Sequence, residues 1–326
     1  MKKIYICLPV HDEEKNLENC VSSINKSIKL IPDYLVKIFI CLNGCNDRSK
    51  EVAIHCKEKY SKLGIEIIKS RKGKLNAQEK VLSKIPNNRK IFFIDTDTEI
   101  DKKSIRIILD EFEKHKYLLA VGAFPIAKKY FGYNLWKKFL NNILNIRSRH
   151  PMGEISKLNV KDYHGLAKTN PQKVNTSKEH ELKSKIFFHG RAFAISSKKY
   201  WNKPSKNKKV VGDDSYLSDY IIYHYGKNRI RIRYDAIVYF NPFISLKEHY
   251  RTYKRIYFDL KNLKENYPEF KEIRNHSELM LDKEYVRDQS VLIRFYFLCF
   301  SLIRKIEKLF FRISLEKNPY KIWKKF

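Results

Sequence analysis

The first hundred residues alternate short apolar runs with segments of helical periodicity, and few folds accommodate that alternation. The short apolar runs are residues 3–8, 36–42, 65–68 and 91–94. The segments of helical periodicity between them are 17–28, 49–60 and 77–85. Strands that alternate with helices predict an α/β fold, in which a mostly parallel, twisted sheet is flanked by helices on both faces. Ligands of such sheets lie beyond the carboxyl ends of the strands, so polar residues after each strand become candidates for a site.

The composition suits a folded, strongly basic protein. The chain has 326 residues, enough for one sizeable core and an appendage, and its hydrophobic content of 43% excludes disorder as the main description. Lysine and arginine number 67 against 36 acidic residues, a net charge of +31. This excess predicts attraction to lipid headgroups, nucleic acid or phosphorylated substrates, although a solvated surface without a dedicated partner would have the same composition.

The cysteines and the apolar runs bear on where the protein works. Its six cysteines form no CxxC pair and no cysteine–histidine array with zinc spacing, which favours reduced thiols in a reducing compartment. The first apolar run is too short for a signal peptide, and no stretch reaches the roughly 20 apolar residues of a spanning helix. We therefore expect a cytoplasmic protein whose membrane contact is peripheral, on the inner face of the cell membrane.

Composition divides the chain into three predicted parts. Residues 1–242 form a catalytic domain, in which the polar stretch 151–185 predicts a long loop, either a lid over the site or a plain insertion. Residues 243–285 form a basic helical segment that completes the site. Residues 286–326 form a C-terminal tail with a basic amphipathic helix. That helix fits an anchor at an anionic membrane interface, or a helix docked on the core.

The strongest local signal is Asp95-Thr96-Asp97, which directly follows the apolar run 91–94. Two carboxylates at a strand end can divide their work, because one can bind a ribose while the other binds a hard divalent cation on a diphosphate. The pair alone is weak support, since strand-to-loop turns often carry aspartate. It predicts a Mn²⁺ or Mg²⁺ site at Asp97 and Asp95.

Further motifs stand in a definite order around this pair. They are Pro9-Val10-His11-Asp12-Glu13-Glu14, Leu42-Asn43-Gly44-Cys45-Asn46-Asp47, Gly73-Lys74-Leu75-Asn76-Ala77, Gly212-Asp213-Asp214 and the segment 245–256. The ordered set resembles family 2 glycosyltransferases of the GT-A fold, which show PxYNE, DGSTD, GKxxAxN, DxD, ED and QxxRW elements. The resemblance covers roughly residues 1–260 and is more specific than any single motif. It implies an inverting enzyme that uses a nucleotide-sugar donor and a divalent metal.

The resemblance also implies roles on the donor side. The residues implied in donor binding are Pro9, His11, Glu13, Asn43, Lys74, Asp95, Arg251 and Arg255. His11 would stack on the nucleobase, Asn43 would read its edge, and Lys74 would meet the phosphates as a point charge. Glu79 stands where the family often has asparagine, which puts the third element in doubt.

Two arginines of the last element stand one helical turn apart. Arg255 would clamp the diphosphate by its planar fork, with Arg251 beside it, and a solvated basic helix face is the other interpretation. Thr252 and Ile256 occupy the family's Gln and Trp positions, which puts any polymer-synthase subtype in doubt.

The remaining candidates concern the acceptor. The resemblance places Asp213 and Asp214 at the catalytic acid pair, with Asp214 as the base, although either carboxylate could instead cap a helix. Gly190 and His189 match the segment that lines the acceptor side, where a missing Cβ lets the backbone approach a sugar. His189 is alternatively a metal ligand or a structural histidine.

Together these patterns predict transfer of a sugar from a nucleotide-sugar to an acceptor hydroxyl, in the synthesis of a cell-surface glycan, polysaccharide or glycolipid. The expected partners are the donor, a glycan or lipid-linked acceptor and an anionic membrane surface, with no specific nucleic acid. Two alternatives stay open: a basic nucleic-acid-binding protein, and a metal-dependent nucleotidyltransferase on a similar fold. The sugar, the nucleobase and the oligomeric state depend on pocket shape, which motifs do not determine.

Overall fold

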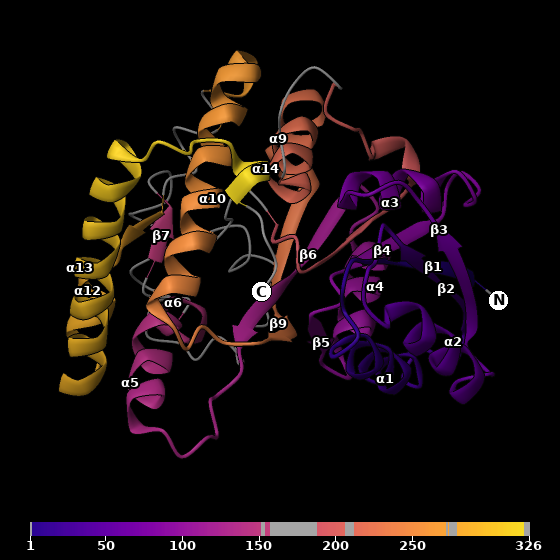
Figure 1. Cartoon of the computed structure of the whole chain (residues 1–326). Coiled ribbons are helices and arrows are strands. Elements are labelled where there is room, and N and C mark those ends of the chain that lie inside the picture. The colour runs from indigo at the N-terminus through magenta and orange to yellow at the C-terminus, as the bar shows by residue number, and fades with distance from the viewer. Residues whose placement is uncertain are drawn as a thin grey trace. The chain divides into compact units, whose positions relative to one another are not determined.

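The structure is a computed structural model that describes residues 2–150, 154–156, 188–205, 212–271, 273 and 279–322 (Figure 1). The chain forms two compact units. The sheet unit comprises Met1–Pro125, Ile186–Lys203 and Asp213–Phe240, and the helical unit comprises Ile126–Lys185, Pro204–Gly212 and Asn241–Phe326. Residues 126–150, which the sequence prediction assigned to the catalytic domain, thus cluster with the C-terminal helices. The functional domain boundaries stay a prediction, and nearly all of the predicted loop 151–185 lies outside the described residues.

The sheet unit contains a mixed sheet of eight strands. They are β1 (Lys2–Val10), β2 (Tyr34–Leu42), β3 (Gly64–Lys69), β4 (Lys90–Ile94), β5 (Thr98–Ile100), β6 (Ala120–Ala127), β8 (Ala192–Ile195) and β9 (Ile230–Phe240). Their order in space is β3-β2-β1-β4-β8-β6-β9-β5. The first four in that order run parallel, whereas β8 pairs antiparallel with β4 and β6, and β5 with β9. The α/β prediction is confirmed, and β1–β4 form a parallel part of the sheet.

Each face of this sheet has its own buried core, because successive side chains of a strand point to opposite faces. Ile4, Ile6 and Leu8 of β1 pack with α1 (Leu17–Ile28), α2 (Ser49–Lys59) and α4 (Ser104–Lys114). Tyr5 and Cys7 pack on the other side with α3 (Lys74–Leu82) and α9 (Asp213–Tyr225). Short 3₁₀ helices η4 (Lys198–Tyr200) and η5 (Lys227–Arg229) complete the unit. Helices therefore cover both faces, as the alternation predicts.

The helical unit is built mainly from α-helices. They are α5 (Leu135–Leu144), α6 (Ile146–Arg149), α10 (Leu246–Asn266), α12 (Lys283–Arg287), α13 (Val291–Ile313) and α14 (Pro319–Ile322), with the 3₁₀ helix η6 (Pro268–Phe270). A two-stranded antiparallel sheet pairs β7 (Glu154–Ser156) with β10 (Leu279–Leu281). The core of this unit includes Ile143, Phe297 and Phe300. Among the helices that the structure describes, none combines the length and the apolar character needed to cross a bilayer.

Candidate active site

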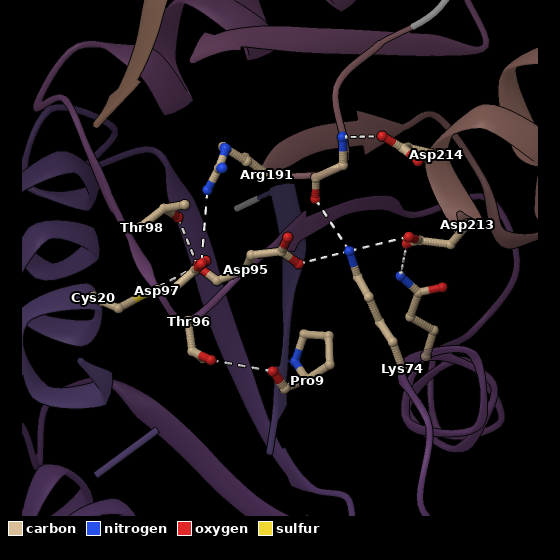
Figure 2. Close-up of polar contacts among 12 residues, drawn as sticks. Pro9, Cys20, Lys74, Asp95, Thr96, Asp97, Thr98, Arg191, Asp213 and Asp214 are labelled. Atoms are coloured by element: carbon tan, nitrogen blue, oxygen red, sulfur yellow. Dashed lines mark hydrogen bonds and ion pairs between the residues drawn. The ribbon is translucent and has the colours of Figure 1, made fainter. Parts of the chain in front are cut away.

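The candidate site lies in the sheet unit, where β4 ends beside the start of β8. The backbone N–H of Asp95, just after β4, donates to the carbonyl oxygen of Arg191 at 2.9 Å. Thr96 is buried and donates from its hydroxyl to the carbonyl of Pro9, at the end of β1, at 3.3 Å. Thr98 donates back to the carbonyl of Asp95 at 2.6 Å (Figure 2). These bonds hold the two aspartates on a braced turn at the carboxyl ends of parallel strands, where the sequence predicts the site.

Lys74, at the start of α3, lies between two of the predicted acids (Figure 2). Its ammonium nitrogen is 2.7 Å from Asp95 Oδ1 and 3.1 Å from Asp213 Oδ1, and it donates to the carbonyl of Gly190 at 3.3 Å. Burial lowers the pKa of Lys74, but the charges of Asp213 and Asp95 outweigh burial and raise it above its usual value. The lysine is therefore a permanent positive charge that joins α3, β4 and the start of α9.

The two aspartates of the turn have different surroundings. Burial raises the pKa of Asp95 to about 6; the charge of Lys74 opposes this rise, while Asp97 and Asp213 add to it. Asp97 is 46% exposed, and its carboxylate lies 3.7 Å from the guanidinium of Arg191. That guanidinium also stacks 3.8 Å from the ring centroid of Phe240, at the end of β9. Asp97 is thus the more accessible carboxylate of the pair.

The charges at this rim suit a divalent cation. Asp95 and Asp213 pair with Lys74, Asp97 pairs with Arg191, and Asp214 accepts the backbone N–H of Gly190, whose carbonyl accepts from Lys74. Four formal negative charges against two positive charges leave a formal excess of −2. Carboxylate oxygens are the ligands that Mg²⁺ and Mn²⁺ prefer, and one or two carboxylates with substrate phosphates commonly complete such a site. The residues present therefore fit the predicted metal.

Asp213 is held on both sides of its carboxylate. Its side chain is 7% exposed, and Oδ2 accepts a hydrogen bond from Gln78 Nε2 at 2.6 Å while Oδ1 faces Lys74. The fully buried Gln78 in turn accepts from the indole N–H of Trp201 at 3.3 Å. Sequence reasoning missed Gln78, Trp201 and the pairing of Arg191. The sequence signals for these residues were weak: Gln78 lies in the element that begins at Gly73-Lys74, and Arg191 directly follows Gly190.

Asp214 is partly exposed and lies against Gly190. Its Oδ2 accepts the backbone N–H of Gly190 at 2.7 Å, and its Oδ1 accepts the N–H of Ser215 at 2.8 Å. A Cβ added to Gly190 would come within 3.0 Å of Asp214 Cγ and Oδ2. Because Gly190 has no side chain, the carboxylate of Asp214 can occupy the space beside it. The helix α9 begins at Asp213, so both acids stand in its first turn, where negative charge is favourable.

The residues predicted to bind the nucleobase and ribose lie at the ends of β1 and β2. Asn43 is buried; its amide donates to the carbonyl of Val10 at 2.8 Å and accepts the N–H of Gly73 at 3.2 Å. Glu13 is buried and accepts from Asn16 at 2.8 Å. His11 Nε2 lies 3.8 Å from an oxygen of Asp12. These contacts order the loops, and the predicted roles of His11, Glu13 and Asn43 in donor binding stay predictions.

A separate group of possible metal ligands lies in these loops. Asp12, Cys45 and Asp47 each offer an atom, all within 4.8 Å of one another. Both carboxylates already accept backbone bonds, however: Asp12 from Asn46 at 2.7 Å, and Asp47 from Ser49 at 3.0 Å at the start of α2. These contacts brace the two loops, and cation binding at Asp97 and Asp95 stays a prediction.

The roles of three further predicted residues stay predictions. His189 is exposed, next to Gly190. Arg251 and Arg255 are half-buried on α10 in the helical unit, so their predicted contact with the donor diphosphate stays a prediction. Glu79, which departs from the family pattern, is half-exposed and pairs with Lys203 at 2.6 Å.

An α/β sheet with acids gathered at one rim is compatible with several classes of enzyme, and comparison with known families narrows them. Residues 5–199, more than half of the chain, match Glycosyl transferase family 2. The chain belongs to this family and is a glycosyltransferase. The resemblance inferred from the motifs is thereby confirmed at the level of the family.

The chain was also compared with solved structures and with curated protein sequences. Glucosyl-3-phosphoglycerate synthase from Mycobacterium tuberculosis, in complex with Mn²⁺, UDP and phosphoglyceric acid, is 14% identical, with a TM-score of 0.48 over 81% of this chain and 78% of that one. TarS 1–349 from S. aureus is 13% identical, with a TM-score of 0.49 over 99% of this chain and 78% of that one. A mycobacterial protein is 14% identical, with a TM-score of 0.47 over 79% and 73%. No curated protein sequence matches the chain.

Proposed function

We propose that this protein is an inverting glycosyltransferase that moves a sugar from a nucleotide-sugar to the hydroxyl of a glycan or lipid-linked acceptor. The observation that carries the proposal is that one set of contacts at the rim of the sheet brings four charged groups together. Lys74 pairs with Asp95, Lys74 and Asp214 both bond to the backbone of Gly190, and Asp97 pairs with the neighbouring Arg191. Acids for a cation, a fixed positive charge and a candidate base are the groups that displacement at an anomeric carbon requires. Synthesis of a cell-surface glycan, polysaccharide or glycolipid is the proposed setting.

Asp97 and Asp95 would hold a divalent cation, Mn²⁺ or Mg²⁺, which when bound neutralises the donor diphosphate. Lys74 keeps Asp95 in place by its ion pair and adds positive charge at the rim. Arg191 holds Asp97 by an ion pair and is itself fixed by stacking on Phe240. These contacts position the two carboxylates before any ligand arrives, which lowers the cost of ordering them on binding.

Asp214 is the proposed catalytic base. Its carboxylate is partly exposed, whereas the carboxylate of Asp213 is buried between Lys74 and Gln78. An acceptor oxygen would form its bond to the anomeric carbon on the face opposite the leaving nucleoside diphosphate, and Asp214 would take the hydroxyl proton. The bond to the leaving oxygen breaks, the anomeric configuration inverts and no covalent enzyme intermediate forms. Asp213 serves as a positioning residue for Lys74.

Replacing the proposed base tests this mechanism. In Asp214→Asn the side-chain oxygen can still accept the N–H of Gly190, but the amide cannot take a proton. We expect transfer to fall by about 10² to 10⁴, as positioned proton transfer typically contributes, while binding of the donor nucleotide stays nearly unchanged. Asp110→Asn, at a carboxylate that is 65% exposed on α4, is the matched control and should keep full activity. A fully active Asp214→Asn enzyme refutes the assignment.

The product of the reaction separates this proposal from the nucleotidyltransferase alternative. A glycosyltransferase releases a nucleoside diphosphate, whereas a nucleotidyltransferase releases pyrophosphate. The basic nucleic-acid-binding alternative accounts for the charge of +31 but leaves the acids at the sheet rim without a role. A cytoplasmic location, peripheral to the inner face of the cell membrane, is part of the proposal, and the helical unit offers a surface for it.

A further inference from the structure

Helix α13 has two apolar faces. Phe297, Phe300 and Phe311 are at most 5% exposed and pack within the helical unit. Leu298 and Leu309 are 68% and 61% exposed. Leu298 precedes Phe300, and Leu309 precedes Phe311, by two positions, which is a rotation of about 200° around a helix. One face of the helix is therefore docked, and the nearly opposite face is equally apolar but open.

A basic stripe runs between these two faces. Arg294, Lys305, Lys308 and Arg312 are all exposed. The helix has one acidic residue, Glu307, which is buried and bonded to His249 at 2.7 Å. The open side of α13, which the structure describes in full, thus carries leucine and phenylalanine beside uncompensated positive charge.

Exposed aromatic residues just before α5 and in its first turn lie near this open face. Phe131, Tyr133 and Trp136 are 85%, 98% and 61% exposed. Trp136 stacks on Phe139 with ring centroids 5.5 Å apart, and Phe139 lies 6.4 Å from Phe295 of α13. Within the helical unit, α5 lies beside the first part of α13 (Figure 1). Two segments distant in the sequence therefore share one aromatic and aliphatic surface.

We propose that this surface, formed by residues 131–136 and the open face of α13, docks on an anionic bilayer. A helix with an apolar face beside lysine and arginine lies in the plane of a membrane interface, and aromatic side chains such as Trp136 and Tyr133 sit at headgroup depth. The helix would be about 34 Å long, since 23 residues each rise about 1.5 Å. The whole of α13 can therefore lie along the bilayer surface.

The charge of the surface decides between occupants. A second copy of this chain would bring four more basic residues of α13 against the first four, which repel one another. Anionic headgroups instead attract each of them. An acceptor held in the same membrane would then be concentrated near the enzyme, and in this respect the inference deepens the proposed function.

Substitutions on the open face test the inference better than removal of the helix, because removal would uncover the core around Phe297 and Phe300. The measurement is cosedimentation of the full chain with phosphatidylcholine vesicles that contain or lack phosphatidylglycerol. Leu302→Glu/Leu309→Glu should weaken binding to the anionic vesicles by about tenfold or more, because both leucines leave the apolar contact. Leu35→Glu/Ile54→Glu, which makes the same charge change at residues 50% and 42% exposed in the sheet unit, is the matched control.

A second pair of variants tests the basic stripe. Lys305→Gln/Arg312→Gln should weaken binding to anionic vesicles by about tenfold or more and reduce its dependence on salt, whereas Lys57→Gln/Lys62→Gln on the sheet unit should not. The fluorescence of Trp136 tests whether residues 131–136 contact the bilayer. Its emission should shift to the blue when anionic vesicles are added, and this shift should be absent in Trp136→Phe.

Several outcomes would overturn the inference. One is that the chain ignores anionic vesicles at low salt, and another is that the variants of α13 bind them as well as their controls. A third is that Leu302→Glu/Leu309→Glu converts a dimer to a monomer without any effect on vesicle binding, which would assign the face to a protein contact. Because no donor or acceptor is present in these measurements, failure here leaves the proposed reaction standing. A failure of Asp214→Asn to lose activity leaves the membrane inference standing in the same way.

Discussion

Asp213 and Asp214 are adjacent in the chain and identical in chemistry, but their carboxylates differ in surroundings. Asp213 is enclosed by Lys74 and Gln78, whereas Asp214 is partly exposed against the backbone of Gly190. A proton acceptor needs access to the substrate, and the carboxylate of Asp213, buried between Lys74 and Gln78, lacks it. The division between a positioning acid and a candidate base therefore follows from partners that come from other parts of the chain.

The close approach of Gly190 to Asp214 gives a prediction at this scale. Gly190→Ala would place a Cβ within 3.0 Å of Asp214 Cγ and Oδ2, so the carboxylate must move. A displacement of about 1 Å in a catalytic group can cost about 10²-fold in rate, and we expect a fall of that order in kcat with the fold retained. Gly64→Ala is the control, since its added Cβ comes no closer than 3.3 Å to a neighbouring atom. Equal turnover by the two variants would count against Asp214 as the base.

At the scale of elements, the amino-terminal end of β9 is tied to α4 by a buried ion network. Glu111 of α4 is 3% exposed and pairs with Arg231 at 2.5 Å and with Arg233, both on β9. The same strand ends at Phe240, on which Arg191 stacks beside Asp97. The network therefore stabilises the strand that supports one side of the candidate cation site.

Glu111→Gln should destabilise the sheet unit, because it removes the carboxylate that pairs with the buried Arg231 and with Arg233, of which Arg233 keeps its pair with Asp235. Breaking a buried pair in this way typically costs about 3–5 kcal/mol in the free energy of unfolding. Glu58→Gln, at an exposed position on α2, should cost little. Chemical denaturation at neutral pH measures the difference, and a change as small as in the control would show that the network is dispensable.

The effect of Glu111→Gln on the free energy of unfolding should depend on pH. Burial raises the pKa of Glu111, but hydrogen bonds from Arg231 and Arg233 outweigh it and hold that pKa below its usual value of 4.5. A lowered pKa means that the ionised group contributes stability above about pH 4.5 and loses it as the pH falls further. The gap in unfolding free energy between the unaltered protein and Glu111→Gln should therefore be widest near neutral pH and narrow in acid. A gap that widens on acidification would contradict the assigned charge.

At the scale of the whole molecule, donor and metal binding should appear as added stability. A nucleoside diphosphate at about 100 times its dissociation constant adds about 2.7 kcal/mol to the free energy of unfolding, and the melting temperature rises accordingly. We expect Mn²⁺ to increase this rise in melting temperature. EDTA should remove the increase due to Mn²⁺, and Asp97→Asn should abolish that increase. Asp110→Asn serves as the control. If Asp12→Asn abolished the manganese effect and Asp97→Asn did not, the cation would belong to the loops after β1 and β2.

Much of the fold and part of the site can be predicted from the amino-acid sequence. The alternation of apolar runs and periodic segments determines β1 to β4 and the helices between them, because each pattern depends on neighbouring residues. The positions of Asp95 and Asp97 directly after β4, and of Lys74 at the start of α3, follow from the same local patterns. The ordered motifs were enough to indicate the family that residues 5–199 match.

Only the tertiary structure decided which groups meet. Lys74 contacts Asp213, Gln78 supports that aspartate, and Arg191 reaches Asp97, because β8 and α9 return to the sheet after long intervening segments. The sequence also left α13 with two interpretations, a docked helix or a membrane helix. The structure buries one apolar face of α13 and leaves the other open, since an element can pack only one side against its own unit and periodicity does not say which.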